Sequence, residues 1–160
     1  GKRVKLDEKT SNFLQADISR NIFQMQKILL GKIFFGKEDI RFLEDSIFIS
    51  PDGLLGVIPK MRRANRLIGS NMSFSKKSIY SINGFDEEFR LPAVGEDTDL
   101  AWRFKAVGLR LKSVRNLAIQ YHLYHKECWS DKSENFARML ENRKQNRFYC
   151  IKGLNTVGPV

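Results

Sequence analysis

The order of predicted elements along the 160 residues indicates an α/β domain in which helices flank a mixed sheet. Apolar residues recur with helical spacing around residues 13–29, 75–84, 100–107 and 133–148. Alternating or small-residue runs at residues 4–6, 67–75, 108–114 and 116–125 are typical of strands. Because helical and strand patterns alternate along most of the chain, we expect one domain spanning residues 1–160.

The first helix follows a short strand, and we expect Thr10 or Ser11 to begin it. Its apolar stripe predicts core packing and no function, and comprises Phe13, Leu14, Ile18, Ile22, Phe23, Met25, Ile28 and Leu29. A tight turn is expected at Pro51-Asp52-Gly53.

Composition limits the classes of protein and partner. With 42% apolar residues and 12 Phe the chain can fill one modest core, and none of its apolar runs is long enough to span a bilayer. Its 28 Lys and Arg outnumber 18 Asp and Glu, a charge that suits nucleic acid, an anionic membrane surface or a phosphorylated substrate. The basic clusters lack interleaved aromatic residues, which disfavours nucleic acid, and a solvated basic face without a role fits equally well. The two cysteines lack metal or redox spacing, so a cytoplasmic setting is the simplest expectation.

Three acidic residues stand out in this basic chain, because Glu96, Asp97 and Asp99 occupy four consecutive positions. They precede an apolar run with helical spacing that stops at Gly108, a natural C-terminal cap. Carboxylates in a first helical turn are stabilised by the N–H groups and the helix dipole, so capping is one interpretation. A cap needs one acid and neighbouring acids repel one another, and we therefore favour a functional site.

Both histidines of the chain lie in the segment YHLYH, where His122 and His125 are three residues apart. A helix would place the two imidazoles on one face, and the alternation in NLAIQYHLYH also permits a strand that ends there. Imidazole is a common ligand of Mn, Zn and similar ions. Two structural histidines beside aromatic residues are the alternative.

The segments GSNMSFSKKSIYSINGFDE and GEDTDLAWR resemble the acceptor-side signature of inverting glycosyltransferases with the GT-A fold. The similarity is greatest to family 2 enzymes and β-1,4-galactosyltransferases, and it covers roughly residues 69–125. The resemblance implies transfer of a sugar from a nucleotide-sugar to a glycan or lipid-linked acceptor. The expected donor is a UDP-sugar, and UDP-galactose is one candidate. Bacterial polysaccharide biosynthesis is the expected setting, with peripheral contact at the inner, anionic membrane face.

The same resemblance implies roles for individual residues. Asp97, second in the ED pair, corresponds to the catalytic base. The expected acceptor contacts are Glu96, Asp99, Asn71, Gly84 and Phe85. Arg103 is expected to contact the donor diphosphate, and His122 and His125 are expected to line the metal site without the sequence deciding which of them is the ligand.

A complete GT-A enzyme also has a nucleotide-binding half with a D-x-D metal motif after a hydrophobic strand. The DTD at residues 97–99 opens a helix instead, so we expect the chain to be the C-terminal, acceptor-side half of such a fold. The divalent metal, Mn or Mg, is then expected only together with the donor half. The isolated chain is expected to be inactive. It is also expected to form a homodimer through the surface that the donor half would cover. A basic, non-catalytic module that binds nucleic acid or an anionic surface is the alternative function.

Overall fold

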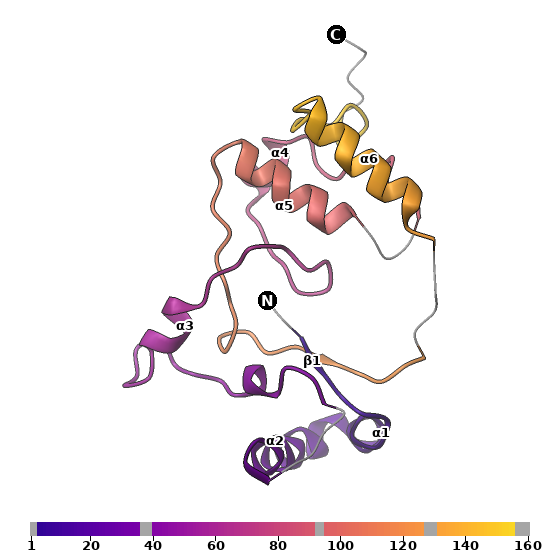
Figure 1. Ribbon diagram of the computed structural model, residues 1–160. Coiled ribbons are helices and arrows are strands. Elements are labelled where there is room, and N and C mark those ends of the chain that lie inside the picture. The colour runs from indigo at the N-terminus through magenta and orange to yellow at the C-terminus, as the bar shows by residue number, and fades with distance from the viewer. Residues whose placement is uncertain (1–2, 36–39, 92–94, 127–130, 156–160) are drawn as a thin grey trace. The chain divides into compact units, whose positions relative to one another are not determined.

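The structure, a computed structural model, describes residues 3–35, 40–91, 95–126 and 131–155 (Figure 1). Two compact units make up the chain. Unit 1 comprises Gly1–Arg62 with Ser113–Glu127, and unit 2 comprises Arg63–Lys112 with Cys128–Val160. The predicted acid cluster therefore belongs to unit 2 and the histidine pair to unit 1.

Unit 1 contains a two-stranded parallel sheet formed by β1 (Val4–Lys5) and β2 (Tyr121–His122). The register pairs Val4 with Tyr121 and Lys5 with His122. The predicted strand at residues 4–6 is present, and of the predicted strand at residues 116–125 only its centre pairs. This small sheet beside helices is compatible with the α/β class, while its identity as half of a GT-A fold stays a prediction.

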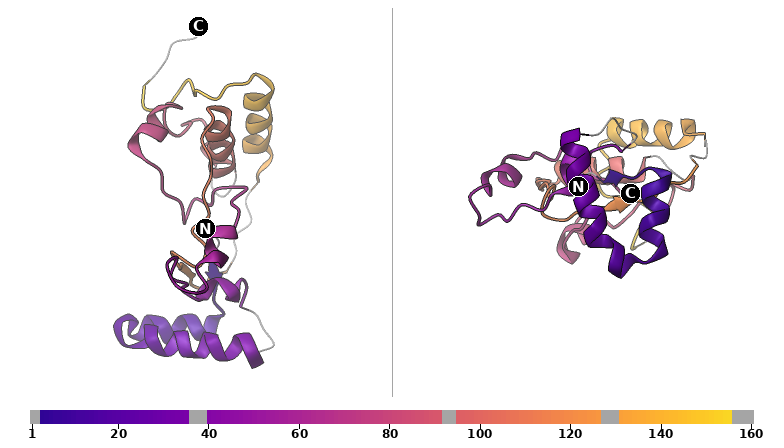
Figure 2. Two further views of the ribbon diagram at one scale, coloured as in Figure 1. Left: turned by 90° about the vertical axis from the view of Figure 1, so that its left-hand side faces the viewer. Right: turned by 90° about the horizontal axis from the view of Figure 1, so that it is seen from below.

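Helices α1 (Glu8–Ala16) and α2 (Ile18–Phe35) follow β1 and pack against each other (Figure 2). The prediction that one helix begins at Thr10 or Ser11 is wrong. Asp7 is the N-cap, because its carboxylate accepts a hydrogen bond from the Thr10 N–H at 2.6 Å. Asp17 separates the two helices, since its extended backbone and its side-chain bond to Arg20 N–H replace helical pairing.

The core of unit 1 lies between β1 and the two helices and consists of Val4, Leu6, Leu14, Met25, Leu29 and Ile40. Three members of the predicted core stripe, Ile18, Phe23 and Ile28, are instead exposed. The predicted stripe is wrong at these positions because it assumed one continuous helix, and the break at Asp17 changes which residues face the core. Among the described residues, no helix has the length and apolar content that a membrane crossing requires.

Unit 1 also contains two short helices, η1 (Leu43–Ser46) and α3 (Val57–Met61). The predicted turn precedes α3, with Gly53 N–H donating to Ser50 O at 3.2 Å. Asp45 of η1 is buried and accepts a bond from Arg115 Nε at 2.8 Å. This ion pair anchors the segment that leads into β2.

Unit 2 contains α4 (Lys76–Tyr80), α5 (Glu96–Ala106) and α6 (Ser133–Lys144). Ser75 caps α4 by accepting a bond from Ser78 N–H at 3.1 Å, and Gly108, at φ +79°, ends α5 as predicted. Ile82, Leu100 and Phe104 form the core between α4 and α5. The predicted helix at residues 133–148 ends four residues early, at Lys144.

Two predicted strands are absent from unit 2. Residues 67–75 form turns and irregular backbone, and residues 108–114 contribute a single antiparallel bridge between Lys112 and Arg63. Asn71 N–H donates to Ile68 O at 2.8 Å, so the Gly69-Ser70 step is a tight turn. Strand patterning alone does not form a strand, because a strand needs a neighbour with which to pair.

The Asp7 cap gives a first testable prediction. Burial opposes ionisation of Asp7, but bonds from Thr10 N–H and Lys32 Nζ outweigh it and lower its pKa. Asp7→Ala should therefore lower the free energy of unfolding by about 1 kcal/mol at neutral pH. The difference should shrink as the pH falls below the usual aspartate value of 3.8, since a lowered pKa stabilises the fold only while the carboxylate is ionised. Denaturant unfolding across this pH range, with the exposed Asp52→Ala as control, measures both effects.

Candidate functional site

The acid cluster occupies the first turn of α5, which is where the sequence places it. Gly95 is the N-cap at φ +109°, and Asp99 N–H donates to its carbonyl at 2.7 Å. A side chain at position 95 would also lie 2.9 Å from the Phe89 ring. Glycine is therefore required at this entry to the helix on both grounds.

Asp97 is half-buried, and its carboxylate is oriented by two hydrogen bonds. Gly69 N–H donates to Oδ2 at 3.1 Å, and Thr98 Oγ1 donates to Oδ1 at 3.2 Å. These bonds hold the carboxylate between the start of α5 and the turn at residues 68–71. The sequence predicted this carboxylate but not the backbone donor 28 residues earlier.

The turn at residues 68–71 lies directly against the two leading acids. A Cβ atom added to Gly69 would lie 4.0 Å from both Asp97 Oδ2 and Glu96 Oε1. Asn71 ends this turn and is half-buried, as is Glu96. The structure thus brings three of the predicted residues, Asn71, Glu96 and Asp97, to one part of unit 2.

Asp99 differs from its two neighbours because its side chain points into the protein. It is 0% exposed and accepts a bond at 2.7 Å from Nε of Arg103, which is 1% exposed. Burial raises the pKa of Asp99, and the Arg103 charge opposes that shift without reversing it. Neither side chain is accessible to a ligand in this arrangement. The predicted acceptor contact of Asp99 and donor contact of Arg103 stay predictions that require the pair to open.

The Arg103 guanidinium also holds the turn that carries Gly84 and Phe85. Nη1 donates to Ile82 O at 3.1 Å and to Gly84 O at 2.8 Å. Gly84 has φ +83°, and a Cβ there would lie 2.8 Å from the Leu154 side chain. One buried arginine therefore joins this turn, called the NGF turn after its residues 83–85, to the helix that carries Asp97.

Phe85 emerges from this turn and is partly exposed. Its ring centroid lies 6.0 Å from that of Phe74, which lies 5.7 Å from that of Phe104 in the core. This row of rings connects the core to the surface beside the NGF turn. An exposed aromatic ring in such a place is suited to stacking on the apolar face of a sugar.

Several residues that support the site were not identified from the sequence. Asn83 donates through Nδ2 to Cys150 O and to Asn155 O, both at 2.8 Å. Asn142 of α6 donates to buried Asp86 at 3.2 Å. An Asn-Gly pair such as residues 83–84 is typical of a turn, but nothing local indicated partners 56 to 72 residues away.

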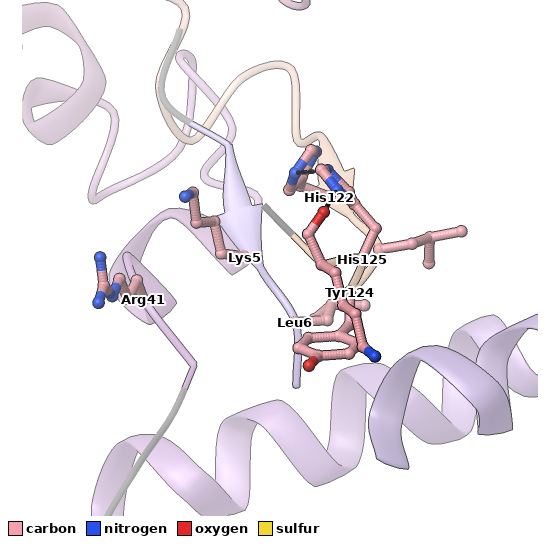
Figure 3. Close-up of a pocket in the computed structure, with 8 residues that line it drawn as sticks. Lys5, Leu6, Arg41, His122, Tyr124 and His125 are labelled. Carbon is pink, nitrogen blue, oxygen red and sulfur yellow. Dashed lines mark hydrogen bonds between the residues drawn. The ribbon is translucent and has the colours of Figure 1, made fainter. Parts of the chain in front are cut away.

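In unit 1 the histidine pair lines a pocket of about 300 Å³ (Figure 3). His122 is on β2 and His125 follows in irregular backbone, so the strand alternative for this segment is correct. The two Nε2 atoms are 3.1 Å apart, and His125 Nδ1 lies 3.0 Å from Lys126 O. The remaining lining residues include three cationic side chains and none that is acidic: Lys5, Leu6, Arg41, Leu123, Tyr124 and Lys126.

The fit of the pair to a metal ion follows from this geometry. Two nitrogens 3.1 Å apart can both lie about 2.1 Å from one ion, a usual metal–imidazole distance. Within the described residues, however, no group of three His, Cys, Asp or Glu side chains converges. The pair fits two positions of a coordination sphere. Its nitrogen donors suit Mn better than Mg, which prefers oxygen.

Comparison with known protein families supports the resemblance that the motifs suggested. Residues 59–126 match the family described as the N-terminal domain of galactosyltransferase. The match supports a relationship to galactosyltransferase-like glycosyltransferases, and its range includes every predicted site residue. Comparisons with curated proteins and with solved structures returned no match. The family description names an N-terminal domain, so the placement of this chain in an acceptor-side, C-terminal half stays a prediction.

Proposed function

We propose that the chain provides the acceptor-side part of an inverting, metal-dependent glycosyltransferase in which Asp97 is the general base. The family match supports a glycosyltransferase function for residues 59–126. The observation that carries the assignment of Asp97 is the difference among the three acids. Asp97 and Glu96 are half-buried at the start of α5, whereas Asp99 is enclosed and paired with Arg103.

The reaction needs a carboxylate in such a position. In an inverting transfer the acceptor hydroxyl attacks the anomeric carbon, the bond from that carbon to the nucleotide diphosphate breaks, and the hydroxyl loses its proton to a base. The Gly69 N–H bond to Asp97 Oδ2 and the Thr98 bond to Oδ1 orient the carboxylate that would take this proton. Fixed orientation matters because a base acts only within hydrogen-bond distance of the hydroxyl.

The neighbouring residues would hold the acceptor sugar. Glu96 adjoins Asp97 and would accept bonds from sugar hydroxyls, while Phe85 offers an exposed ring beside the NGF turn. Asn71 and Gly84 belong to the two turns that frame these groups. We propose a glycan or lipid-linked sugar as acceptor and a UDP-sugar as donor.

The proposed metal would be held in part by His122 and His125, and the donor half with its D-x-D carboxylates would lie outside residues 1–160. When bound, the ion neutralises charge that develops on the departing diphosphate. The contribution of this chain is to present two imidazole nitrogens from one strand end.

The proposal as a whole is tested by assaying the full-length polypeptide with a panel of UDP-sugars, UDP-galactose included, in the presence of Mn. Loss of transfer on chelation, restored by Mn, is the expected result, whereas an absence of transfer to any glycan or lipid-linked acceptor contradicts it.

A second testable prediction concerns the metal requirement. His122→Ala and His125→Ala in the full-length polypeptide should each raise the Mn concentration needed for half-maximal activity, since loss of a ligand weakens binding. Tyr124→Phe, which alters another residue of the same pocket, is the matched control and should leave the requirement unchanged. An unchanged Mn requirement in both histidine variants would show that the pair is structural.

A further inference from the structure

Helix α2 is apolar on two opposite faces. Met25 and Leu29 point into the core of unit 1 and are buried. On the opposite face, Phe23 is 70% exposed, Phe34 is 74% exposed, and Leu30 between them is also exposed. These three positions are separated by seven and four residues and therefore share one side of a helix. A surface helix normally carries polar residues there.

The same exposed face is basic. Arg20 lies one turn before Phe23, and Lys27 lies between Phe23 and Leu30. Five residues therefore form a continuous outer stripe: Arg20, Phe23, Lys27, Leu30 and Phe34. Helix α2 contains no Asp or Glu over its 18 residues. Within the described part of the chain, neither Arg20 nor Lys27 forms an ion pair, whereas Lys32, outside the stripe, pairs with Asp7 at 3.0 Å.

We propose that this outer stripe binds the surface of an anionic lipid bilayer. A helix that combines exposed Phe and Leu with Lys and Arg lies in the plane of the lipid headgroups, where the rings enter the acyl boundary and the cations meet lipid phosphates. Because α2 itself carries no acidic residue, the helix contributes no repulsion from such a surface. The chain as a whole, with a formal charge of +10, is attracted to it as well.

A second copy of the chain is a poorer occupant of this face. In a two-fold dimer each stripe packs on an identical stripe, so Arg20 and Lys27 of one copy would meet only apolar and cationic residues of the other. With no acid on α2 to balance them, this contact would bury cations without an anionic partner. Charge complementarity therefore selects the lipid surface.

The experiment is co-sedimentation of the 160-residue chain with vesicles of phosphatidylcholine alone and of phosphatidylcholine mixed with phosphatidylglycerol. The chain should bind the mixed vesicles and not the neutral ones. Replacing both rings, Phe23→Gln with Phe34→Gln, should abolish binding. Removing both charges, Arg20→Gln with Lys27→Gln, should weaken it about tenfold or more. Phe136→Gln with Leu140→Gln is the matched control, because these α6 residues are similarly exposed and one turn apart on a helix that carries glutamates.

The outcomes separate the alternatives. Circular dichroism of each variant shows whether the helices are retained, and the α6 variant should bind as the parent does. Absence of binding to mixed vesicles, or equal loss in the α6 variant, would overturn the proposal. A parent chain that sediments as a dimer and becomes a monomer when Phe23 and Phe34 are replaced, without vesicle binding, would overturn it in favour of self-association. None of these measurements depends on the glycosyltransferase assignment.

Discussion

Asp97→Asn in the full-length polypeptide should reduce the turnover number by about 10²–10⁴-fold, the usual effect of removing a general base. Asparagine is nearly the same size and can still accept the Gly69 N–H bond, so the start of α5 should stay intact. Donor affinity should change little, because the proposed base acts on the acceptor hydroxyl. Steady-state kinetics with donor and acceptor varied separately would measure both quantities.

Two controls make this result specific to position 97. Asp52→Asn changes an exposed aspartate in unit 1 and should leave the kinetics unaffected. Glu96→Gln removes the adjacent carboxylate and should raise the acceptor KM more than it lowers the turnover number. Near-normal turnover in Asp97→Asn would reject the assignment of the base, even if the protein proves to be a glycosyltransferase.

Arg103→Met should cause the largest loss of stability in unit 2. The substitution leaves the Asp99 carboxylate buried without its partner, and removing one member of a buried ion pair typically costs about 3–5 kcal/mol. It also takes the Nη1 donor away from the carbonyls of Ile82 and Gly84. Denaturant unfolding, together with hydrogen exchange of the α5 amides, would measure the loss.

Two further variants separate the effect of losing the buried Arg103 charge from the effect of losing any arginine. Arg143→Met on α6 removes an exposed arginine and should change stability by a few tenths of a kcal/mol at most. Asp99→Leu combined with Arg103→Met removes both buried charges and should recover part of the loss, because the cost of an unpaired carboxylate disappears. An Arg103→Met variant as stable as the parent would contradict the role we assign to this pair.

Local sequence patterns determined where the helices of unit 2 begin, because the signals that set a helix start lie within a few residues, whereas α4 and α6 each end about four residues before the predicted end. Ser75 begins α4, the acids open α5, and Gly108 ends α5 at a positive φ. The family resemblance carried by residues 69–125 likewise depended on short motifs and agrees with the match to residues 59–126.

The tertiary structure alone decided what the acidic residues face. Glu96, Asp97 and Asp99 look alike in the sequence, yet a helix turns positions 99 and 103 to the same side, where burial and the Arg103 fork enclose Asp99. Asp97 is instead oriented by a backbone N–H from a distant turn. Such partners are set by packing, which no local pattern encodes.

The strands show the same limit. The small-residue run at residues 67–75 and the alternation at residues 108–114 predicted sheet, but the structure forms a turn and a single bridge there. Alternation says which side chains would share a face, whereas hydrogen bonds to a neighbouring strand decide whether a strand exists. The sequence by itself thus determined where the helices of unit 2 begin and the identity of the acidic and histidine groups, but not the break at Asp17 in unit 1. Packing between distant residues decided which of these groups are enclosed and which are presented at the surface, because burial depends on contacts that local spacing does not specify.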